Sequence, residues 1–151
     1  MQGIVIKSTG SWYSVLSPNG QKTDCRVRGK FRLGGQQSTN PIAVGDKVEF
    51  EMEPGQATAV ITELHERDNY IIRKATNLSR QSHIIASNMN QAALVVTLAQ
   101  PRTSLGFIDR FLVTAEAYRI PVIMVFNKFD LYSVEAIEIM RELEALYTAI
   151  G

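Results

Sequence analysis

The spacing of apolar residues changes partway along the chain, and this change restricts the possible folds more than any other feature. Up to about Leu64, apolar and polar residues alternate between turn-forming residues, which is typical of short antiparallel strands. From about Gln91, continuous apolar runs are followed by helical periods, which is typical of parallel strands packed against helices. We therefore expect the 151 residues to combine an all-β part with an α/β part.

The N-terminal part, residues 1–72, is expected to form a small closed barrel. The candidate strands are 3–8, 12–17, 24–32, 46–52 and 57–64. Glycine, proline and asparagine separate them, as in Pro18-Asn19-Gly20, and these residues favour turns. Five short strands favour closure into a barrel, because closure removes strand edges that would otherwise aggregate.

The C-terminal part, residues 91–151, is expected to begin an open α/β sheet in the order βαβα. Residues 92–98 and 120–126 are almost entirely apolar, as parallel strands covered by helices must be. Residues 107–119 place apolar side chains along one stripe of a helix. A second helix is expected to begin at Ser133, whose hydroxyl can cap it.

The segment between the two parts, residues 73–90, is interpreted as a basic linker. It contains arginine and lysine, including Lys74 and Arg80, but no acidic residue.

Composition excludes several classes of protein. No run of about 18 apolar residues and no N-terminal signal segment is present, so we expect a cytoplasmic protein without a membrane partner. The single cysteine, Cys25, cannot form an intramolecular disulfide, and no cysteine cluster is available for zinc. We therefore expect no metal site in this chain. The net charge of +1 does not argue for or against nucleic acid as a partner.

One short motif points to chemistry: Asn127-Lys128-Phe129-Asp130, directly after the second apolar strand. Open α/β sheets bind ligands at this end of their strands, and NKxD is the pattern with which GTPases recognise guanine. The Asp130 carboxylate can accept hydrogen bonds from the ring N1–H and the exocyclic amine of guanine. Adenine would leave it unpaired, at a cost of about 1 to 3 kcal/mol. The alternative is a chance match in a solvated loop.

Asn127 and Lys128 have supporting roles in this interpretation. The Lys128 stem can lie along the flat face of the base while its ammonium group reaches neighbouring loops. The Asn127 amide, which has a donor and an acceptor, can tie the turn to the phosphate loop.

The phosphate loop itself is missing from these residues. No GxxxxGK[ST] motif occurs, and the only Gly-Lys pair, Gly29-Lys30, is followed by Phe31. In the common GTPase order the phosphate loop comes before the NKxD motif. Either the order is permuted, or the domain is not a GTPase.

Basic residues at alternate positions suggest a contact with RNA. Arg26, Arg28, Lys30 and Arg32 share one face of the expected strand 24–32, and apolar residues share the other. Such a stripe attracts phosphates through release of counterions, and we add Lys74 and Arg80 of the linker to the RNA-binding candidates. The alternative is a face that only keeps the barrel soluble.

The two aromatic residues at the start of the second strand leave a choice open. Trp12 and Tyr13 could stack on bases. Because aromatic residues of small barrels are more often buried, we interpret both as core residues.

Six stretches together resemble one known family. They are Cys25 to Arg32, Val44 to Val48, Glu66 to Arg73, Asn88 to Gln91, Ile108 to Leu112 and Asn127 to Leu131. The sequence is similar to the RsgA (YjeQ) family, circularly permuted GTPases that depend on the small ribosomal subunit and carry NKxD ahead of the phosphate loop.

The resemblance implies a β plus α/β architecture. A five-stranded OB-fold barrel that binds ribosomal RNA would be followed by the first βαβα portion of a permuted P-loop GTPase domain. The phosphate loop, both switches and a C-terminal zinc-binding domain would lie beyond Gly151. We therefore expect guanine recognition but no catalytic residue and no metal ligand in this chain, which would be inactive alone.

The implied function is hydrolysis of GTP to GDP, with Mg²⁺, in late maturation of the small ribosomal subunit. The rival hypothesis is a non-enzymatic OB-fold RNA-binding module whose α/β appendage docks partners. We expect the complete protein to be monomeric. This chain is expected to self-associate, because its incomplete sheet exposes an apolar edge and face.

Overall fold

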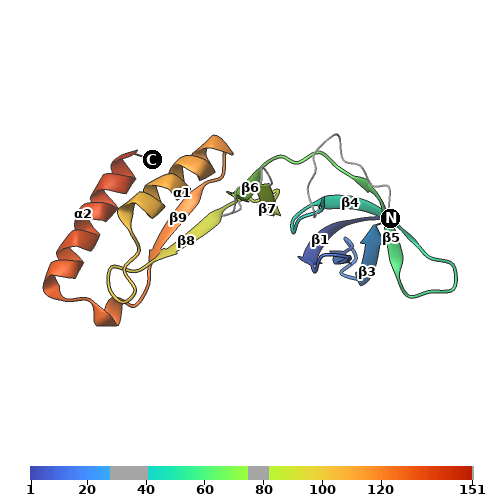
Figure 1. The fold of residues 1–151 in the computed structure, drawn as a ribbon, viewed down its shortest axis with the longest axis horizontal. Helices are drawn as coiled ribbons and strands as arrows, with labels where there is room; N and C mark the ends of the chain where they lie inside the picture. The colour runs from blue at the N-terminus through green and yellow to red at the C-terminus, as the bar shows by residue number, and fades with distance from the viewer. Residues whose placement is uncertain (28–40, 75–81, 151) are drawn as a thin grey trace. The chain divides into compact units, whose positions relative to one another are not determined.

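The computed structural model describes residues 1–27, 41–74 and 82–150. The chain divides into two compact units, Met1–Met89 and Asn90–Gly151 (Figure 1). The boundary lies close to Gln91, where the hydrophobic pattern of the sequence changes.

The first unit contains a closed five-stranded barrel in the order β1-β2-β3-β5-β4. Its strands are β1 (Gln2–Ser8), β2 (Trp12–Leu16), β3 (Lys22–Val27), β4 (Lys47–Met52) and β5 (Ala59–Leu64). All neighbouring strands are antiparallel except β3 and β5, which run parallel and close the barrel. The predicted barrel is confirmed, and its strands lie close to the predicted positions. Residues 28–32 of the expected strand 24–32 lie outside the described residues.

The barrel core comes from the inward-facing side chains of this alternating pattern. It consists of Val5, Tyr13, Val15, Cys25, Ile42, Val48, Phe50, Ala59 and Ile61. Cys25 is fully buried, and burial, together with the adjacent Asp24 carboxylate, raises the pKa of its thiol to about 11. The thiol therefore remains protonated at neutral pH and packs as a small apolar group.

The segment expected to be a basic linker contains regular structure, which is a correction. Strands β6 (Tyr70–Lys74) and β7 (Ser82–Ser87) pair antiparallel, with Ile72 opposite Ile84. The β-branched pairs Ile71-Ile72 and Ile84-Ile85 favour strands, and the basic residues beside them do not prevent pairing. This hairpin belongs to the same compact unit as the barrel.

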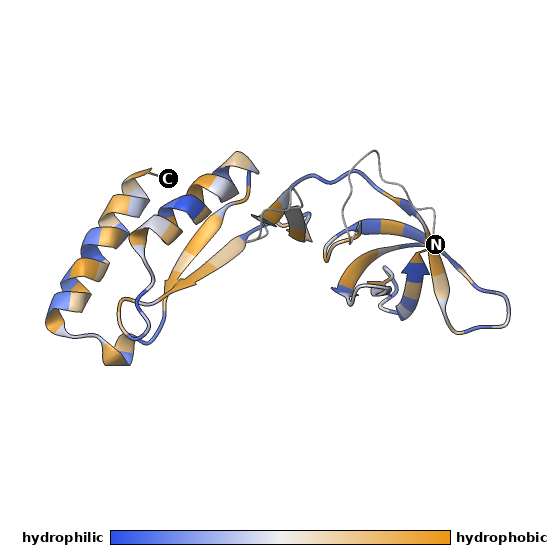
Figure 2. Ribbon diagram, in the orientation of Figure 1, coloured by the Kyte–Doolittle hydropathy of each residue, from blue (hydrophilic) through white to orange (hydrophobic). Residues whose placement is uncertain are grey.

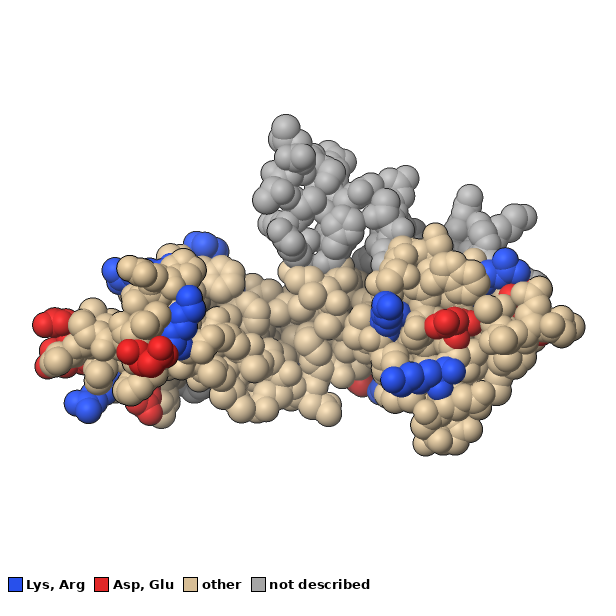
Figure 3. Space-filling view, turned by 90° about the horizontal axis from the view of Figure 1, so that it is seen from below, with Lys and Arg blue, Asp and Glu red and all other residues tan. Residues whose placement is uncertain are grey.

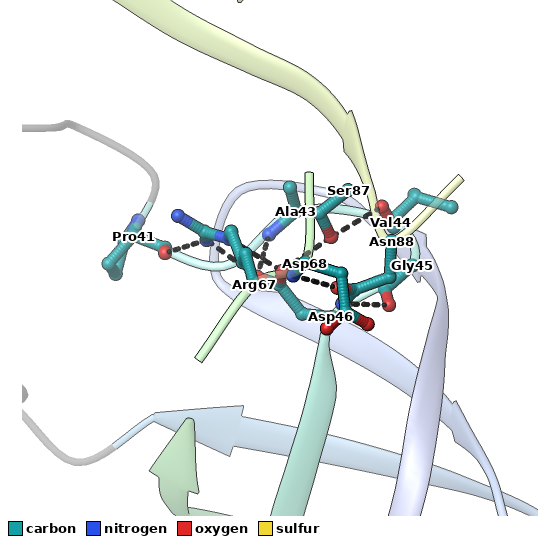
Figure 4. A network of polar contacts seen from close by, with 9 residues as sticks. All are labelled: Pro41, Ala43, Val44, Gly45, Asp46, Arg67, Asp68, Ser87 and Asn88. Carbon is teal, nitrogen blue, oxygen red and sulfur yellow. Dashed lines mark hydrogen bonds and ion pairs between the residues drawn. The ribbon is translucent and has the colours of Figure 1, made fainter. Parts of the chain in front are cut away.

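A buried carboxylate fastens the hairpin to the barrel (Figure 4). Asp46, which has no exposed surface, accepts hydrogen bonds from the Nε and Nη2 of Arg67, both at 2.7 Å. The same carboxylate accepts from the Ser87 hydroxyl of β7 at 2.5 Å and from the Ala43 amide at 2.8 Å. Four donors therefore compensate the cost of burying this charge.

Close backbone packing completes this junction. Gly45 has a φ of +93°, and a Cβ atom at this position would lie 2.0 Å from the Ser87 carbonyl oxygen. The Asn88 side chain donates to the Gly45 carbonyl at 3.0 Å and accepts from the Asp68 amide at 2.8 Å. One interlocked joint is therefore formed by residues 41–46, residues 67–69 and the end of β7.

The second unit holds two parallel strands with their helices. The elements are β8 (Ala92–Val96), α1 (Leu105–Ala117), β9 (Val122–Phe126), the 3-10 turn η1 (Phe129–Leu131) and α2 (Val134–Ile150). β8 and β9 pair in register from Ala92 with Val122 to Val96 with Phe126. Helix α1 begins two residues before the predicted start, with Ser104 as its cap, and Ser133 accepts from the Ala136 amide at the start of α2 as predicted.

The two faces of this small sheet differ in burial. On one face, Leu94 and Val96 pack with Ile108 of α1. On the other face, Val95 and Ile123 are 56% and 49% exposed, and Figure 2 shows apolar residues along both strands. The sequence pattern predicts that both faces of this sheet are buried by packing. In the described residues, one of the two faces is buried in this way.

Candidate functional site

The NKxD residues form a sharp turn at the carboxyl end of β9. The Asn127 amide donates to the Val96 carbonyl at 2.8 Å, which continues the ladder between β8 and β9 by one bond. Lys128 then takes a left-handed conformation with φ 60° and ψ 37°. The Lys128 backbone amide donates to the side-chain oxygen of Asn127 at 2.8 Å. The next residues, Phe129–Leu131, make one turn of 3-10 helix. The structure thus brings the four predicted guanine-binding residues together.

Lys128 connects this turn to the loop that follows β8. Its ammonium group donates to the Gln100 carbonyl at 2.7 Å. That loop is closed at its base, where the Thr97 amide donates to the Thr103 hydroxyl at 3.0 Å and the Thr103 amide donates back to the Thr97 carbonyl at 2.8 Å. The ammonium group reaches a neighbouring loop, as predicted, and this bond restricts the direction of the lysine stem.

Asp130 presents a carboxylate to solvent from the middle of the turn. Within the part of the chain that the structure describes, this carboxylate has no hydrogen bond or ion pair. Phe129 is also exposed, and its ring lies 5.8 Å from the ring of Tyr132 between centroids. Asp130 is therefore available to accept two donors from a ligand.

Tyr132, just after the motif, is a residue that sequence reasoning missed. Its hydroxyl donates to the Asn127 carbonyl at 2.9 Å and accepts from the Leu98 amide at 3.0 Å. Nothing in the motif marks this residue, because a tyrosine at the start of a helix is equally compatible with packing.

The described part of the basic stripe contains one cation, Arg26 of β3. Its side chain points outward and is hydrogen-bonded to Glu53 at 2.5 Å. This bond, and the negative charge of Glu53, raise the pKa of the guanidinium. On the same face Asp24 accepts from the Ser14 hydroxyl at 2.7 Å. Acidic and basic groups therefore lie close together on this face. Figure 3 shows one side of the molecule, on which acidic and basic side chains are likewise mixed.

The other RNA-binding candidates are placed only in part. Lys74 is the last residue of β6, opposite Ser82 in the ladder. Arg28, Lys30, Arg32 and Arg80 lie outside the described residues.

Trp12 and Tyr13 differ in burial, so the prediction for one of them is wrong. Tyr13 is 2% exposed, lies in the core as predicted, and donates from its hydroxyl to the Gly10 carbonyl at 3.1 Å. Trp12 is 45% exposed and stands opposite Arg26 in the register of β2 and β3. Alternation along a strand places neighbours on opposite faces, so only one of the two can be in the core.

The described residues contain neither of two further kinds of feature, a metal-ligating cluster or a membrane-spanning helix. No group of three or more metal-ligating side chains occurs among residues 1–27, 41–74 and 82–150. No helix in these ranges is long and apolar enough to cross a membrane.

Two family models match the chain. One, described as the RsgA N-terminal domain, matches residues 2–61, and the other, described as RsgA GTPase, matches residues 64–151. The chain belongs to the RsgA family. The resemblance inferred from the sequence motifs is confirmed.

Over the full length of this chain, about half of its residues are identical in the curated relatives. The small ribosomal subunit biogenesis GTPase RsgA of Christiangramia forsetii is 54% identical over 153 residues, which cover all of this chain and 49% of that protein. The protein of the same name from Bacteroides fragilis is 53% identical over 151 residues, which cover all of this chain and 48% of that protein. The chain thus spans about half the length of these relatives.

Two solved structures share the fold of this chain. The crystal structure of YjeQ from Thermotoga maritima is similar with a TM-score of 0.70 and 35% identity, over 98% of this chain and 48% of that protein. The structure of YloQ, described as a circularly permuted GTPase, gives a TM-score of 0.67 and 32% identity, over 99% of this chain and 48% of that protein. The predicted OB-fold barrel, followed by the first portion of a permuted GTPase domain, is confirmed.

Proposed function

We propose that this chain is the guanine-recognising and RNA-binding part of a GTPase that acts in late maturation of the small ribosomal subunit. The observation that carries the proposal is the NKxD turn of an RsgA-family chain, with the Asp130 carboxylate exposed at the carboxyl end of β9. The names of the relatives from Christiangramia forsetii and Bacteroides fragilis support the role in subunit biogenesis.

Guanine recognition follows from the two oxygens of Asp130. One accepts from the ring N1–H of guanine and the other from its exocyclic amine, while the stem of Lys128, held through Gln100, lies along the base. A bound adenine would leave this carboxylate desolvated and without donors, so the turn selects guanine by the penalty that it imposes on adenine.

Hydrolysis requires groups that these 151 residues lack. No GxxxxGK[ST] motif is present, so we assign no catalytic residue and no metal ligand to this chain, and we propose that it is inactive alone. Mg²⁺ bound with the nucleotide would neutralise phosphate charge during attack by water. Zinc is proposed only for a separate C-terminal domain.

Binding of ribosomal RNA is assigned to the outer face of the barrel and to basic residues of the segment 73–90. The candidate cations are Arg26, Arg28, Lys30, Arg32, Lys74 and Arg80. The exposed ring of Trp12 beside Arg26 supports this assignment, because exposed aromatic groups of OB-folds stack on bases. We also propose that the complete protein is cytoplasmic and monomeric.

The test is the base preference of a hybrid protein. In it, this chain is followed by the part of the Bacteroides fragilis relative that comes after the residues aligned here. We expect fluorescent GDP to bind at least about 100-fold more tightly than the matching ADP, because loss of two hydrogen bonds is costly. Equal binding of both nucleotides, with RNA binding intact, would favour the rival hypothesis of a non-enzymatic RNA-binding module.

A further inference from the structure

The phenol of Tyr132 joins the ends of the two parallel strands. The last ladder bond runs from the Asn127 amide to the Val96 carbonyl at 2.8 Å. Beyond this bond the strands have no further ladder partner, yet the Tyr132 hydroxyl accepts from the Leu98 amide at 3.0 Å and donates to the Asn127 carbonyl at 2.9 Å. A hydroxyl is both donor and acceptor, so it can link a backbone N–H to a backbone C=O.

The same hydroxyl closes the NKxD turn on itself. Asn127 is the first residue of this turn and Tyr132 follows its last, so the bond between them encloses Asp130. Two further bonds hold the interior: the Leu131 amide donates to the Lys128 carbonyl at 3.0 Å and the Tyr132 amide donates to the Phe129 carbonyl at 3.1 Å. The direction of the Asp130 carboxylate therefore depends on a loop that is closed at both ends.

The loop after β8 is coupled to the turn through the same residue. Leu98 lies at the start of the loop whose Gln100 carbonyl accepts from the Lys128 ammonium group at 2.7 Å. Loss of the Tyr132 hydroxyl would leave the half-buried Leu98 amide without its partner. Both the start of this loop and its contact with Lys128 would then be less restricted.

We propose that Tyr132 is a positioning residue for guanine recognition. Its hydroxyl holds the Asn127 backbone and the loop after β8 in the geometry that directs Asp130 at the two guanine donors. The proposal rests on the function proposed above, because it concerns the same turn.

The test compares two nucleotides that differ in one Asp130 contact. Inosine diphosphate lacks the exocyclic amine of guanine, so the ratio of GDP to inosine diphosphate affinity reports how well Asp130 is aimed. In the hybrid protein we expect Tyr132→Phe to weaken GDP about tenfold, which corresponds to one hydrogen bond, and to bring the ratio close to 1.

The matched control is Tyr147→Phe. The Tyr147 hydroxyl donates to Asp109 at 2.7 Å, so this variant removes a phenol hydroxyl from the same unit without touching the turn. We expect it to leave the ratio unchanged. A merely structural role of Tyr132 would lower the thermal midpoint of Tyr132→Phe and leave its nucleotide ratio at the wild-type value.

A second measurement uses the 151-residue chain itself and does not depend on nucleotide binding. In Tyr132→Phe, hydrogen exchange of the Leu98 amide should become at least about tenfold faster, while the Ala92 amide, bonded to Pro121, keeps its rate. An unchanged Leu98 rate overturns the proposal, as does a folded Tyr132→Phe hybrid with the wild-type nucleotide ratio. A wild-type hybrid without guanine preference contradicts the proposed function instead, and the positioning role with it.

Discussion

Asp46 and Arg67 form the ion pair that most clearly supports the fold of the first unit. The carboxylate is fully buried, and the Arg67 guanidinium also donates to the Pro41 carbonyl at 3.0 Å. A buried charge without its partner is much more costly than the intact pair is favourable. The stability of the joint between barrel and hairpin therefore depends on both residues being present.

Removal of Arg67 should be strongly destabilising. We expect Arg67→Met to lower the free energy of unfolding by about 3 to 5 kcal/mol, because Asp46 would stay buried without a counter-charge. The control is Lys47→Met, which removes a cation paired with the exposed Asp68, at a cost below about 1 kcal/mol. Urea unfolding of both variants measures the difference, and equal costs would show that the buried pair has no special role.

Single residues also show where prediction from sequence fails. The role of Asp46 depends on Arg67 and Ser87, which are 21 and 41 positions away, so no local pattern could identify it. Cys25, by contrast, lies in the core on the strand face opposite Arg26, and this alternation is a local property that the sequence already shows.

At the scale of elements, β2 and β3 present the outer face that we assign to RNA. In the described residues, Trp12 and Arg26 stand opposite each other, and Glu53 neutralises part of the positive charge. A phosphate must compete with Glu53 for Arg26. The density of free charge on this face is therefore lower than the sequence alone suggests.

RNA binding should fall steeply with salt and depend on this face. We expect binding of a ribosomal RNA fragment to weaken with a log–log slope of about −3 if four cations contact phosphates of single-stranded RNA. Arg26→Glu should weaken binding, Glu53→Gln should strengthen it, and Arg141→Glu on α2 is the control. Quenching of Trp12, the single tryptophan, reports contact at this face. A salt-independent affinity would contradict the assignment.

The hairpin of β6 and β7 shows why element prediction was incomplete. Period-two alternation identified the five barrel strands, because each has one buried face. In the hairpin, basic residues follow a short β-branched segment, and the pairing of Ile72 with Ile84 becomes visible only in the structure. The place of the NKxD motif directly after β9 was predicted, because the motif and the preceding apolar strand are both local features. The left-handed conformation of Lys128 and the contacts of Tyr132 were not predicted, because they depend on residues of the loop after β8.

At the scale of the whole molecule, we expect the exposed face of β8 and β9 to determine whether the chain self-associates in solution. Val95, Ile123 and Val125 expose apolar surface that parallel sheets normally bury. We expect sedimentation of the 151-residue chain to show concentration-dependent self-association, which Ile123→Glu should abolish. Val113→Glu, at an exposed site on α1, is the control. A monomer at all concentrations would contradict this expectation.

The proposed recognition of guanine by Asp130 is tested most directly by an exchange of base preference. In the hybrid protein, Asp130→Asn should weaken GDP by about 100-fold and strengthen xanthosine diphosphate, because an amide can donate to the second carbonyl of xanthine. Glu138→Gln on α2 makes the same chemical change away from the turn and should leave both affinities unchanged. Fluorescence titration measures the affinities of both variants for both nucleotides. A GDP affinity that Asp130→Asn leaves unchanged would contradict the proposed role of Asp130.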